Sequence, residues 1–258
     1  MNKLSVTIIQ TNLLWEDKTG NLKHFQGKIE NIKAETDLII LPEMFTTGFS
    51  MTPMSFAEKL NGDTVKWMRK MAIAANVAIA GSIIIEENGK YLNRFLFVKP
   101  DGKYQYYDKR HLFAMAGEHK FYTPGDKNVL IEYKGWRIRP LICYDLRFPV
   151  WSRNTDEYDL LIYVANWPEK RITHWKTLLK ARAIENQAFV AGVNRIGTDG
   201  NSYKYSGDSA IYNPLGEKIS KTKPNEDSVE TISISKEFIV NTRTSLPFLH
   251  DRDGFIIH

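Results

Sequence analysis

The segment most informative about the fold reads Ile138-Arg139-Pro140-Leu141-Ile142-Cys143-Tyr144-Asp145-Leu146-Arg147-Phe148-Pro149. Its first five residues form an apolar run with little alternation, which is typical of a strand covered on both faces. Polar residues begin at Cys143, and ligands in α/β folds bind outside the carboxyl ends of strands. This segment is therefore a candidate functional site. Proline removes a ladder donor, so we expect a β-bulge at Pro140.

Similar runs recur on both sides of this segment. Residues 4–9, 37–41, 77–85, 92–98, 160–165 and 189–193 are short, apolar and rich in β-branched side chains, so each is predicted to be a strand. Amphipathic spacing predicts helices over residues 22–32, over 65–72 after a cap at Asp63, and over about 173–187. Strands that alternate with helices predict an α/β fold, which we expect to form one domain over residues 1–258.

Composition limits the classes of function. The chain has 258 residues, 43% of them apolar, which is enough to bury a sizeable core. Its net charge of +5 is spread thinly, and the densest basic stretch, residues 170–182, has the spacing of an exposed helix face rather than of a nucleic-acid surface. No apolar run approaches the roughly 18 residues that span a bilayer, and residues 1–10 lack a signal-peptide core. We expect a cytoplasmic protein without a nucleic-acid or membrane partner.

Common cofactor and metal motifs are absent from the sequence. There is no G-x-G-x-x-G after a strand, no G-x-x-x-x-G-K-[ST] and no G-x-S-x-G. The six histidines form neither H-E-x-x-H nor a pair four residues apart, so a zinc enzyme is not expected. Cys143 is the only cysteine, so this thiol serves either as inert packing or as a chemical group.

Two other predicted strand ends carry reactive side chains. Glu43 follows the apolar run that ends at Pro42, and Lys109 follows the segment 104–107, which we predict to be a strand. Taken singly, Cys143 could be a buried inert thiol, Glu43 a solvated loop carboxylate and Lys109 a surface amine. The three together, each at the end of its own apolar segment, form a specific combination that indicates chemistry.

The surroundings of these three residues match a known pattern. The matching motifs are Pro42-Glu43, Lys109-x-His111-Leu112 and Cys143-Tyr144-Asp145-x-Arg147-Phe148-Pro149. On these motifs the chain resembles the nitrilase superfamily of carbon-nitrogen hydrolases. Its omega-amidase branch is the most similar, from Leu41-Pro42-Glu43-Met44-Phe45 with Gly48-Phe49, from residues 163–168 (YVANWP) and from residues 182–187 (RAIENQ). The resemblance implies a four-layer α-β-β-α sandwich of the nitrilase type and a homodimer.

The resemblance also implies a Glu-Lys-Cys triad that needs no metal or organic cofactor. Cys143 would attack an amide carbon and form a thioester. Glu43 would act as base and then as acid, which calls for a pKa nearer the working pH than the ~4.3 of a free glutamate. Lys109 and the backbone N–H of Tyr144 would meet the developing oxyanion. Glu118 matches the family's second glutamate, which orients the lysine, and its alternative interpretation is a solvated loop charge.

The implied substrate is a small 2-oxo dicarboxylic monoamide such as 2-oxoglutaramate or 2-oxosuccinamate. Its carboxylate needs a cation, and Arg147 is the first candidate because an arginine fork binds a carboxylate through two hydrogen bonds. The alternative is that Arg147 pairs structurally with Asp145. Phe49 and Trp167 are expected to shape the apolar wall of the pocket, although aromatic residues are also common in cores.

Two other functional hypotheses fit the same sequence. One is another hydrolase of the superfamily: an N-carbamoyl-amine hydrolase, a nitrilase or a deaminated-glutathione amidase. The other is a noncatalytic scaffold that has the fold and acts by binding a partner. The triad at strand ends favours an enzyme, because packing alone does not require a Glu, a Lys and a Cys at these positions.

Overall fold

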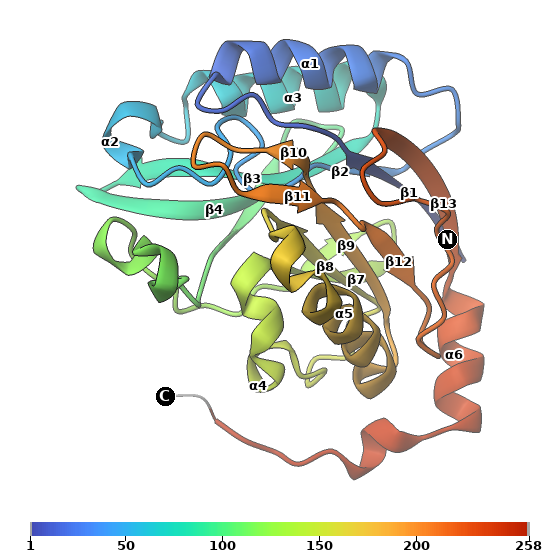
Figure 1. Cartoon of the computed structure of the whole chain (residues 1–258). Coiled ribbons are helices and arrows are strands. Elements are labelled where there is room, and N and C mark those ends of the chain that lie inside the picture. Colours follow the sequence, from blue (N-terminus) through green and yellow to red (C-terminus); the bar gives the residue numbers. More distant parts are fainter. Residues whose placement is uncertain (1, 257–258) are drawn as a thin grey trace.

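The computed structural model describes residues 2–256, in which two β-sheets pack face to face between helices (Figure 1). The strands are β1 (Lys3–Gln10), β2 (Leu38–Ile40), β3 (Ala78–Glu87), β4 (Lys90–Val98), β5 (Tyr104–Asp108), β6 (Ile131–Tyr133), β7 (Trp136–Ile142), β8 (Leu160–Ala165), β9 (Phe189–Asn194), β10 (Ile196–Thr198), β11 (Lys204–Ser206), β12 (Ala210–Tyr212) and β13 (Ser228–Ser235). The helices are α1 (Lys18–Glu30), α2 (Pro53–Phe56), α3 (Asp63–Ala75), α4 (Pro149–Ser152), α5 (Ile172–Asn186) and α6 (Lys236–Ser245).

The order of the strands brings the carboxyl ends of several strands to one region. The larger sheet runs β13-β1-β2-β3-β4-β5 and the smaller one β12-β9-β8-β7-β6, while β10 and β11 pair separately. Strands β1, β2 and β3 are parallel, and two antiparallel steps through β4 turn β5 to the same direction. Strands β7, β8 and β9 are also parallel. Residues that follow β2, β5, β7 and β8 can therefore meet.

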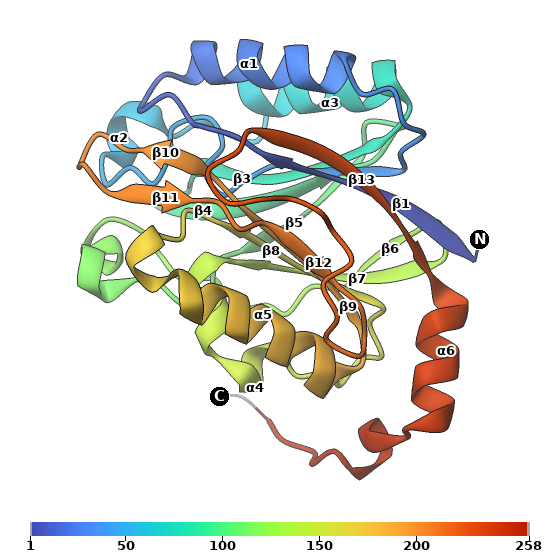
Figure 2. The same cartoon turned by 45° about the vertical axis from the view of Figure 1, so that its right-hand side comes forward.

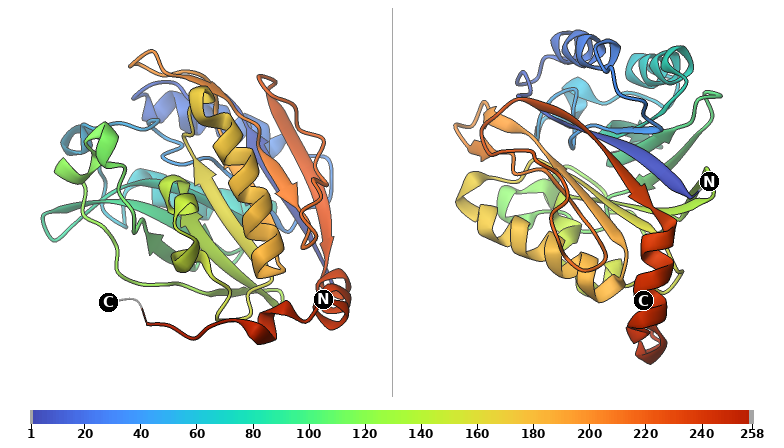
Figure 3. Two further views of the ribbon diagram at one scale, coloured as in Figure 1. Left: turned by 60° about the horizontal axis from the view of Figure 1, so that its bottom comes forward. Right: turned by 90° about the vertical axis from the view of Figure 1, so that its right-hand side faces the viewer.

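Helices α1 and α3 cover the outer face of the larger sheet, and α5 covers the outer face of the smaller one (Figures 2 and 3). This is the four-layer α-β-β-α sandwich that the resemblance implies, and that prediction is confirmed. Both faces of the larger sheet are buried: in β3, Ala78 and Ala80 belong to the core between the sheets, whereas Ile79 and Ile83 belong to the core beneath α1 and α3. Burial on both faces explains why the apolar runs do not alternate.

The helix positions follow from local signals, with one correction at α3. Asp17 caps α1, because its side chain accepts a hydrogen bond from the backbone of Gly20 at 2.9 Å. Asp63 is not a cap: it is the first residue of α3, after Gly62 at the cap position. The side chain that satisfies the first turn comes from Glu58, which accepts a hydrogen bond from the backbone N–H of Thr64 at 2.8 Å.

Helix α5 packs closely on the smaller sheet. A Cβ at Gly192 of β9 would lie 2.4 Å from Leu179, so glycine is what allows this approach. The basic residues Lys176 and Lys180 are exposed, as predicted, but Arg182 is buried and donates hydrogen bonds to Glu185 and to the carbonyl of Leu146. The prediction of an exposed basic face was therefore wrong at Arg182.

The β-bulge predicted at Pro140 is not formed. The register between β7 and β8 continues without interruption through Pro140 and its partner Ile162. The hairpin partner β6 pairs with β7 only as far as Ile138 in the described residues. The missing N–H of Pro140 is tolerated because β6 has already ended there and the other edge keeps its regular ladder.

The first and last strands lie side by side, since β1 pairs with β13 along its whole length from Lys3 with Ser235 to Gln10 with Ser228. The picture agrees, with the N-terminus beside β13 and the start of α6 (Figure 1). None of the helices in residues 2–256 has both the length and the apolar character required to span a membrane.

Candidate active site

The residues predicted to carry chemistry converge between the two sheets. Glu43 lies shortly after β2 and Lys109 directly after β5 in the larger sheet, while Cys143 directly follows β7 in the smaller one. The structure adds Asn166, which directly follows β8. Lys109, Cys143 and Asn166 all line one cavity of about 410 Å³. The residues that follow the predicted strand ends therefore lie close together, and Asn166 joins them although the sequence did not single it out.

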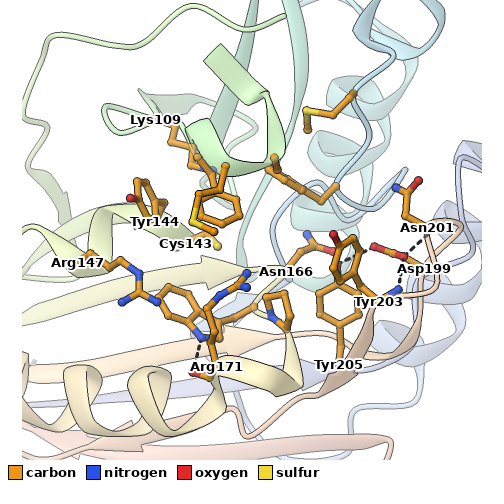
Figure 4. A pocket seen from close by; sticks show the side chains of 17 residues that line it. Lys109, Cys143, Tyr144, Arg147, Asn166, Arg171, Asp199, Asn201, Tyr203 and Tyr205 are labelled. Carbon is orange, nitrogen blue, oxygen red and sulfur yellow. Dashed lines mark hydrogen bonds between the residues drawn. The ribbon is translucent and has the colours of Figure 1, made fainter. Parts of the chain in front are cut away.

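The cavity extends from the Cys143 thiol to two arginines and a hairpin (Figure 4). Its lining comes mainly from the loops that follow β2, β5, β7 and β8 and from the hairpin β10–β11. The lining residues are Phe49, Met51, Lys109, Phe113, Met115, Ala116, Cys143, Tyr144, Arg147, Asn166, Trp167, Pro168, Arg171, Asp199, Asn201, Tyr203 and Tyr205.

Cys143 has a strained backbone that presents its thiol to the cavity. Its φ is +44°, in the left-handed region that non-glycine residues seldom adopt, at the junction between β7 and a short 3₁₀ helix, Cys143–Arg147. Burial raises the pKa of the thiol above its ordinary value, the negative charge of Glu43 raises it further, and the ammonium of Lys109 opposes both. The resting residue is a protonated thiol that needs a base to become a nucleophile.

Lys109 is a buried cation held by two buried carboxylates. Its Nζ donates hydrogen bonds to Glu43 Oε1 at 3.0 Å and to the two oxygens of Glu118 at 2.9 and 3.0 Å. Burial alone would lower the pKa of Lys109, but the charges of Glu118 and Glu43 outweigh burial and raise it. Lys109 therefore stays charged and serves as a fixed positive group rather than as an acid or a base.

Glu43 is fixed in orientation by two asparagines. Asn93 Nδ2 donates to Glu43 Oε1 at 2.8 Å, and the backbone N–H of Asn166 donates to Glu43 Oε2 at 2.8 Å. The side chain of Asn166 also donates to the backbone carbonyl of Glu43 at 2.6 Å. The alternative of a solvated loop carboxylate is wrong, since Glu43 is fully buried. Asn93 lies in the middle of β4, where no sequence pattern distinguishes it from a core residue.

Glu118 is likewise fully buried, so its interpretation as a solvated loop charge is wrong. Besides holding Lys109, it accepts a hydrogen bond from the backbone N–H of Phe113 at 2.5 Å. Burial raises the pKa of Glu118, and the nearby charge of Glu43 adds to this, against the opposing effect of Lys109. The structure thus places Glu118 directly against the predicted triad.

Arg147 lines the cavity and does not pair with Asp145. Its Nη2 contacts His174 Nδ1 at 3.1 Å, and its guanidinium lies over the ring of Trp167 at 4.7 Å from the centroid. Asp145 instead binds Tyr107 and a histidine. The structural alternative for Arg147 is therefore wrong, and Trp167 takes its predicted place in the wall. Phe49 does so too, with Lys109 Nζ 5.1 Å from its ring centroid.

Arg171 is a second arginine of the cavity that the sequence did not single out. It precedes α5, lies over the ring of Phe113 at 5.2 Å from the centroid and lines the cavity with Arg147 (Figure 4). Burial lowers the pKa of Arg147, and the positive charge of Arg171 lowers it further, so the two guanidinium groups act on each other. Within residues 2–256 neither forms an ion pair with a carboxylate.

The hairpin β10–β11 forms the opposite wall and was also missed. Asp199 accepts hydrogen bonds from the backbone of Asn201 and Tyr203, both at 2.9 Å, and from the hydroxyl of Tyr205 at 2.7 Å. These bonds hold the hairpin turn closed. In the described part of the chain, no group of three or more His, Cys, Asp or Glu side chains is arranged to hold a metal ion.

The comparison with protein families decides the assignment, because the model of the carbon-nitrogen hydrolase family matches residues 5–244. The chain belongs to the carbon-nitrogen hydrolase family. This hydrolase is 47% identical over 255 residues to omega-amidase YafV of Escherichia coli K12, covering 99% of both chains. It is 31% identical over 254 residues to the 2-oxoglutaramate amidase of Bacillus subtilis, covering 96% of this chain and 97% of the relative.

Solved structures agree with the fold. The hydrolase superimposes on XC1258 of Xanthomonas campestris, a superfamily protein with an arsenic adduct in its active site, with a TM-score of 0.97, 42% identity and complete coverage of both chains. It also superimposes on Nit3 of Saccharomyces cerevisiae with a TM-score of 0.87, covering 95% of each chain; at 24% identity this likeness supports the fold alone. The predictions of the superfamily and of an enzyme are confirmed.

Proposed function

We propose that this hydrolase is an omega-amidase that converts small 2-oxo dicarboxylic monoamides, such as 2-oxoglutaramate and 2-oxosuccinamate, to the 2-oxo diacid and ammonia. One observation carries the proposal: a single cavity is lined by Cys143, by Lys109 and by two arginines that form no ion pair with a carboxylate within residues 2–256. Such a cavity suits a short molecule with a carboxamide at one end and a carboxylate at the other. The names of the similar amidases from Escherichia coli and Bacillus subtilis support the same substrate class.

Acylation begins with Glu43 and Cys143. Glu43 takes the thiol proton, and the sulfur attacks the carboxamide carbon, so that a C–S bond forms and the carbonyl oxygen gains negative charge. Collapse of this intermediate breaks the C–N bond. The leaving nitrogen takes the proton from Glu43 and departs as ammonia, which leaves a thioester on Cys143.

Lys109 has to exchange a contact to stabilise the oxyanion. Its ammonium has three hydrogens, and in the structure they face one oxygen of Glu43 and both oxygens of Glu118. We propose that one of the two contacts with Glu118 is released when the oxyanion forms, while the other keeps Lys109 in place. The backbone N–H of Tyr144, which follows the nucleophile, is the second proposed donor.

Deacylation uses the same base. Glu43 removes a proton from a water molecule, whose oxygen attacks the thioester carbon and releases the 2-oxo diacid. The proton on Glu43 then returns to the sulfur, so the enzyme ends the cycle unchanged. The overall reaction consumes one water and one amide, and every proton transfer can be assigned to Glu43. Asn93 and Asn166 keep its carboxylate aimed during both steps.

Arg147 and Arg171 are the proposed receptors for the substrate carboxylate. Both line the cavity that contains Cys143, and the positive charges of the two guanidinium groups act on each other, so an anion between them is favoured. We expect Arg147→Lys or Arg171→Lys to raise KM about tenfold for 2-oxoglutaramate, because lysine cannot reproduce the two-pronged contact. KM for an uncharged aliphatic amide should change little.

Steady-state kinetics on the two substrates check this expectation. Arg137→Lys is the matched control, because Arg137 is an arginine of β7 that faces Glu157 rather than the cavity. Equal increases in KM for the charged and the uncharged amide would argue against direct recognition of the carboxylate.

Glu118→Gln should lower the rate of acylation about 10²-fold while changing the melting temperature little. A glutamine has only one acceptor oxygen to replace the contacts with Lys109 and Phe113, so the ammonium is displaced from its working position. Rapid-quench measurement of the first ammonia released gives the acylation rate. The control is Glu58→Gln, in which another largely buried glutamate loses its charge beside Lys18 and the Thr64 backbone, away from the cavity. An unchanged acylation rate in Glu118→Gln would remove Glu118 from the mechanism.

The proposed substrate class is tested by measuring ammonia release from 2-oxoglutaramate, glutamine, a simple aliphatic amide and an N-carbamoyl amine, with a nitrile as a fifth compound. Selective turnover of the 2-oxo amide is expected. Carbon dioxide released together with ammonia would identify an N-carbamoyl-amine hydrolase, and turnover of the nitrile would identify a nitrilase. Deaminated glutathione is a sixth compound, whose hydrolysis releases cysteinylglycine instead of ammonia and is therefore followed through the free dipeptide. Preference for it would move the enzyme to that amidase branch.

Three broader predictions accompany this proposal. We propose that residues 1–258 act as a single catalytic unit, supported by the pairing of β1 with β13 and by a family match that extends over residues 5–244. We also propose that the hydrolase forms a homodimer, as the family resemblance implies. We propose further that it is located in the cytoplasm, as the sequence predicts.

A further inference from the structure

One fully buried carboxylate near the site has no part in the proposed chemistry. Asp145 lies two residues after Cys143, within the same 3₁₀ helix, and is 0% exposed. Its Oδ2 accepts hydrogen bonds from the Tyr107 hydroxyl at 2.8 Å and from the backbone N–H of Ile142 at 3.0 Å. Its Oδ1 accepts from the backbone N–H of His111 at 3.0 Å and contacts His111 Nδ1 at 2.8 Å.

These contacts join the two sheets at the positions that carry the reacting groups. Tyr107 and His111 lie two residues before and two residues after Lys109, at the end of β5 in the larger sheet. Ile142 and Cys143 lie at the end of β7 in the smaller sheet. One carboxylate therefore binds the chain on both sides of the lysine and on the N-terminal side of the nucleophile.

The hydrogen-bond directions in this cluster are determined by its members. The hydroxyl oxygen of Tyr107 already accepts from Trp151 Nε1 at 2.9 Å and from the backbone N–H of Arg110 at 3.1 Å, so its own hydrogen is directed to Asp145. Both oxygens of Asp145 thus face donors, with Nδ1 of His111 carrying its hydrogen. The ring of His111 stacks on Phe148, with centroids 3.6 Å apart and planes 6° apart.

We propose that Asp145 is a positioning residue that keeps the Lys109 ammonium and the Cys143 thiol at the distance and orientation that the reaction needs. It does so by binding Tyr107 and His111, on both sides of the lysine, to the 3₁₀ helix that begins with the nucleophile. It touches neither substrate nor the reacting atoms. The cluster also satisfies the N–H of Ile142, directly before the strained backbone of Cys143, and so helps to maintain the left-handed φ of the nucleophile. If these contacts are lost and Lys109 moves relative to the sulfur, we expect the acylation rate to fall although every catalytic side chain is still present.

Two substitutions of His111 separate positioning from packing. His111→Phe keeps the ring stacked on Phe148 but removes the donor to Asp145, whereas His111→Asn loses the ring but keeps an N–H donor close to the position of Nδ1. The proposal predicts that His111→Phe loses about 10²-fold in kcat with 2-oxoglutaramate at nearly unchanged KM, and that His111→Asn recovers much of this loss. If the ring matters only through packing, the order of the two variants is reversed, and the proposal fails.

A second pair of variants is read out without any substrate. Tyr107→Phe removes the hydroxyl that binds Asp145, and Tyr133→Phe removes a hydroxyl from the same core between the sheets, where it donates to the backbone of Asp37 at 3.0 Å. The charged and titratable groups that act on Cys143 are Glu43, Lys109 and Glu118, with Arg147 and Tyr205 also in range. Of the first three, only Lys109 favours the thiolate.

The rate of Cys143 alkylation by iodoacetamide is measured across pH for both tyrosine variants. Tyr107→Phe should shift the profile to higher pH, because a displaced Lys109 stabilises the thiolate less, and Tyr133→Phe should keep the wild-type profile. A wild-type profile in Tyr107→Phe, or equal shifts in both variants, would overturn the proposal. The kcat measurement rests on the proposed function, but alkylation does not, so absence of 2-oxoglutaramate turnover in the wild type would contradict the substrate and leave the positioning test intact.

Discussion

Cys143→Ala should abolish ammonia release, with a loss of at least about 10⁴-fold in kcat/KM, while the fold stays intact. Removal of the nucleophile from a catalytic triad costs this much or more because the remaining groups cannot form the covalent intermediate. Cys143 is the only cysteine of the chain, so no other thiol can substitute for it. Alanine also has a Cβ, and the backbone strain at φ +44° is therefore about the same in the variant.

Kinetics on 2-oxoglutaramate together with thermal unfolding check this result. Cys143→Ser is the companion variant, since it keeps the shape of the side chain and replaces the thiol by a much weaker nucleophile. Both variants should melt within a few degrees of the wild type, a change that corresponds to about 1 kcal/mol or less. Ammonia release by Cys143→Ala at more than about a hundredth of the wild-type rate would contradict thioester chemistry.

Lys109→Met should have the largest combined effect on activity and stability. It removes an oxyanion donor, which lowers the rate by about 10²–10³-fold. It also leaves the carboxylates of Glu43 and Glu118 buried without the cation that both contact, and removing one partner of a buried ion pair costs about 3–5 kcal/mol in the free energy of unfolding. The double variant Lys109→Met/Glu118→Gln should recover part of that stability without recovering activity.

The stability of Lys109→Met should depend on pH in a defined direction. Burial and the charge of Glu43 raise the pKa of Glu118, whereas the charge of Lys109 and the hydrogen bond from the Phe113 backbone lower it. Without Lys109 the folded state retains a proton on this carboxyl that the unfolded state releases above about pH 4.3. A carboxyl with a raised folded pKa stabilises the protein fully below the unfolded value, and that stability is lost as pH rises through the folded pKa.

Denaturant unfolding between pH 4 and pH 8 measures this dependence. The free energy of unfolding of Lys109→Met should fall toward pH 8 more steeply than that of the wild type, and the double variant with Glu118→Gln should lose most of the extra slope. Equal slopes for Lys109→Met and the wild type would show that Lys109 does not neutralise Glu118.

The sequence predicted most of the central strands from local signals, although two other local predictions, the cap at Asp63 and the β-bulge at Pro140, were wrong. The apolar runs identified the strands that form the centre of each sheet, and the abrupt change from apolar to polar residues located Glu43, Lys109 and Cys143. Each of these signals lies within a few neighbouring residues. The strand β13 was missed because it is only partly buried and its residues Ser228–Ser235 are mostly polar.

Features that depend on contacts between distant segments could not be predicted. Asn93 looks like any residue of an apolar strand until β4 places it against Glu43, fifty positions earlier in the chain. Arg171 and the β10–β11 hairpin reach the cavity only through the packing of the two sheets. The alternative interpretation, in which Arg147 pairs with Asp145, failed for the same reason, since the two side chains that bind this aspartate come from the end of β5 in the other sheet.

The most direct test of the central claim relates the residual ammonia release from 2-oxoglutaramate to the number of alkyl groups bound per chain after graded treatment with iodoacetamide. Because Cys143 is the only cysteine in the chain, a loss of activity that follows thiol alkylation can be assigned to this residue. We expect a straight decline that reaches zero activity at one alkyl group per chain, and we expect that group on the peptide that contains Cys143. Activity that persists in fully alkylated protein would contradict the central claim.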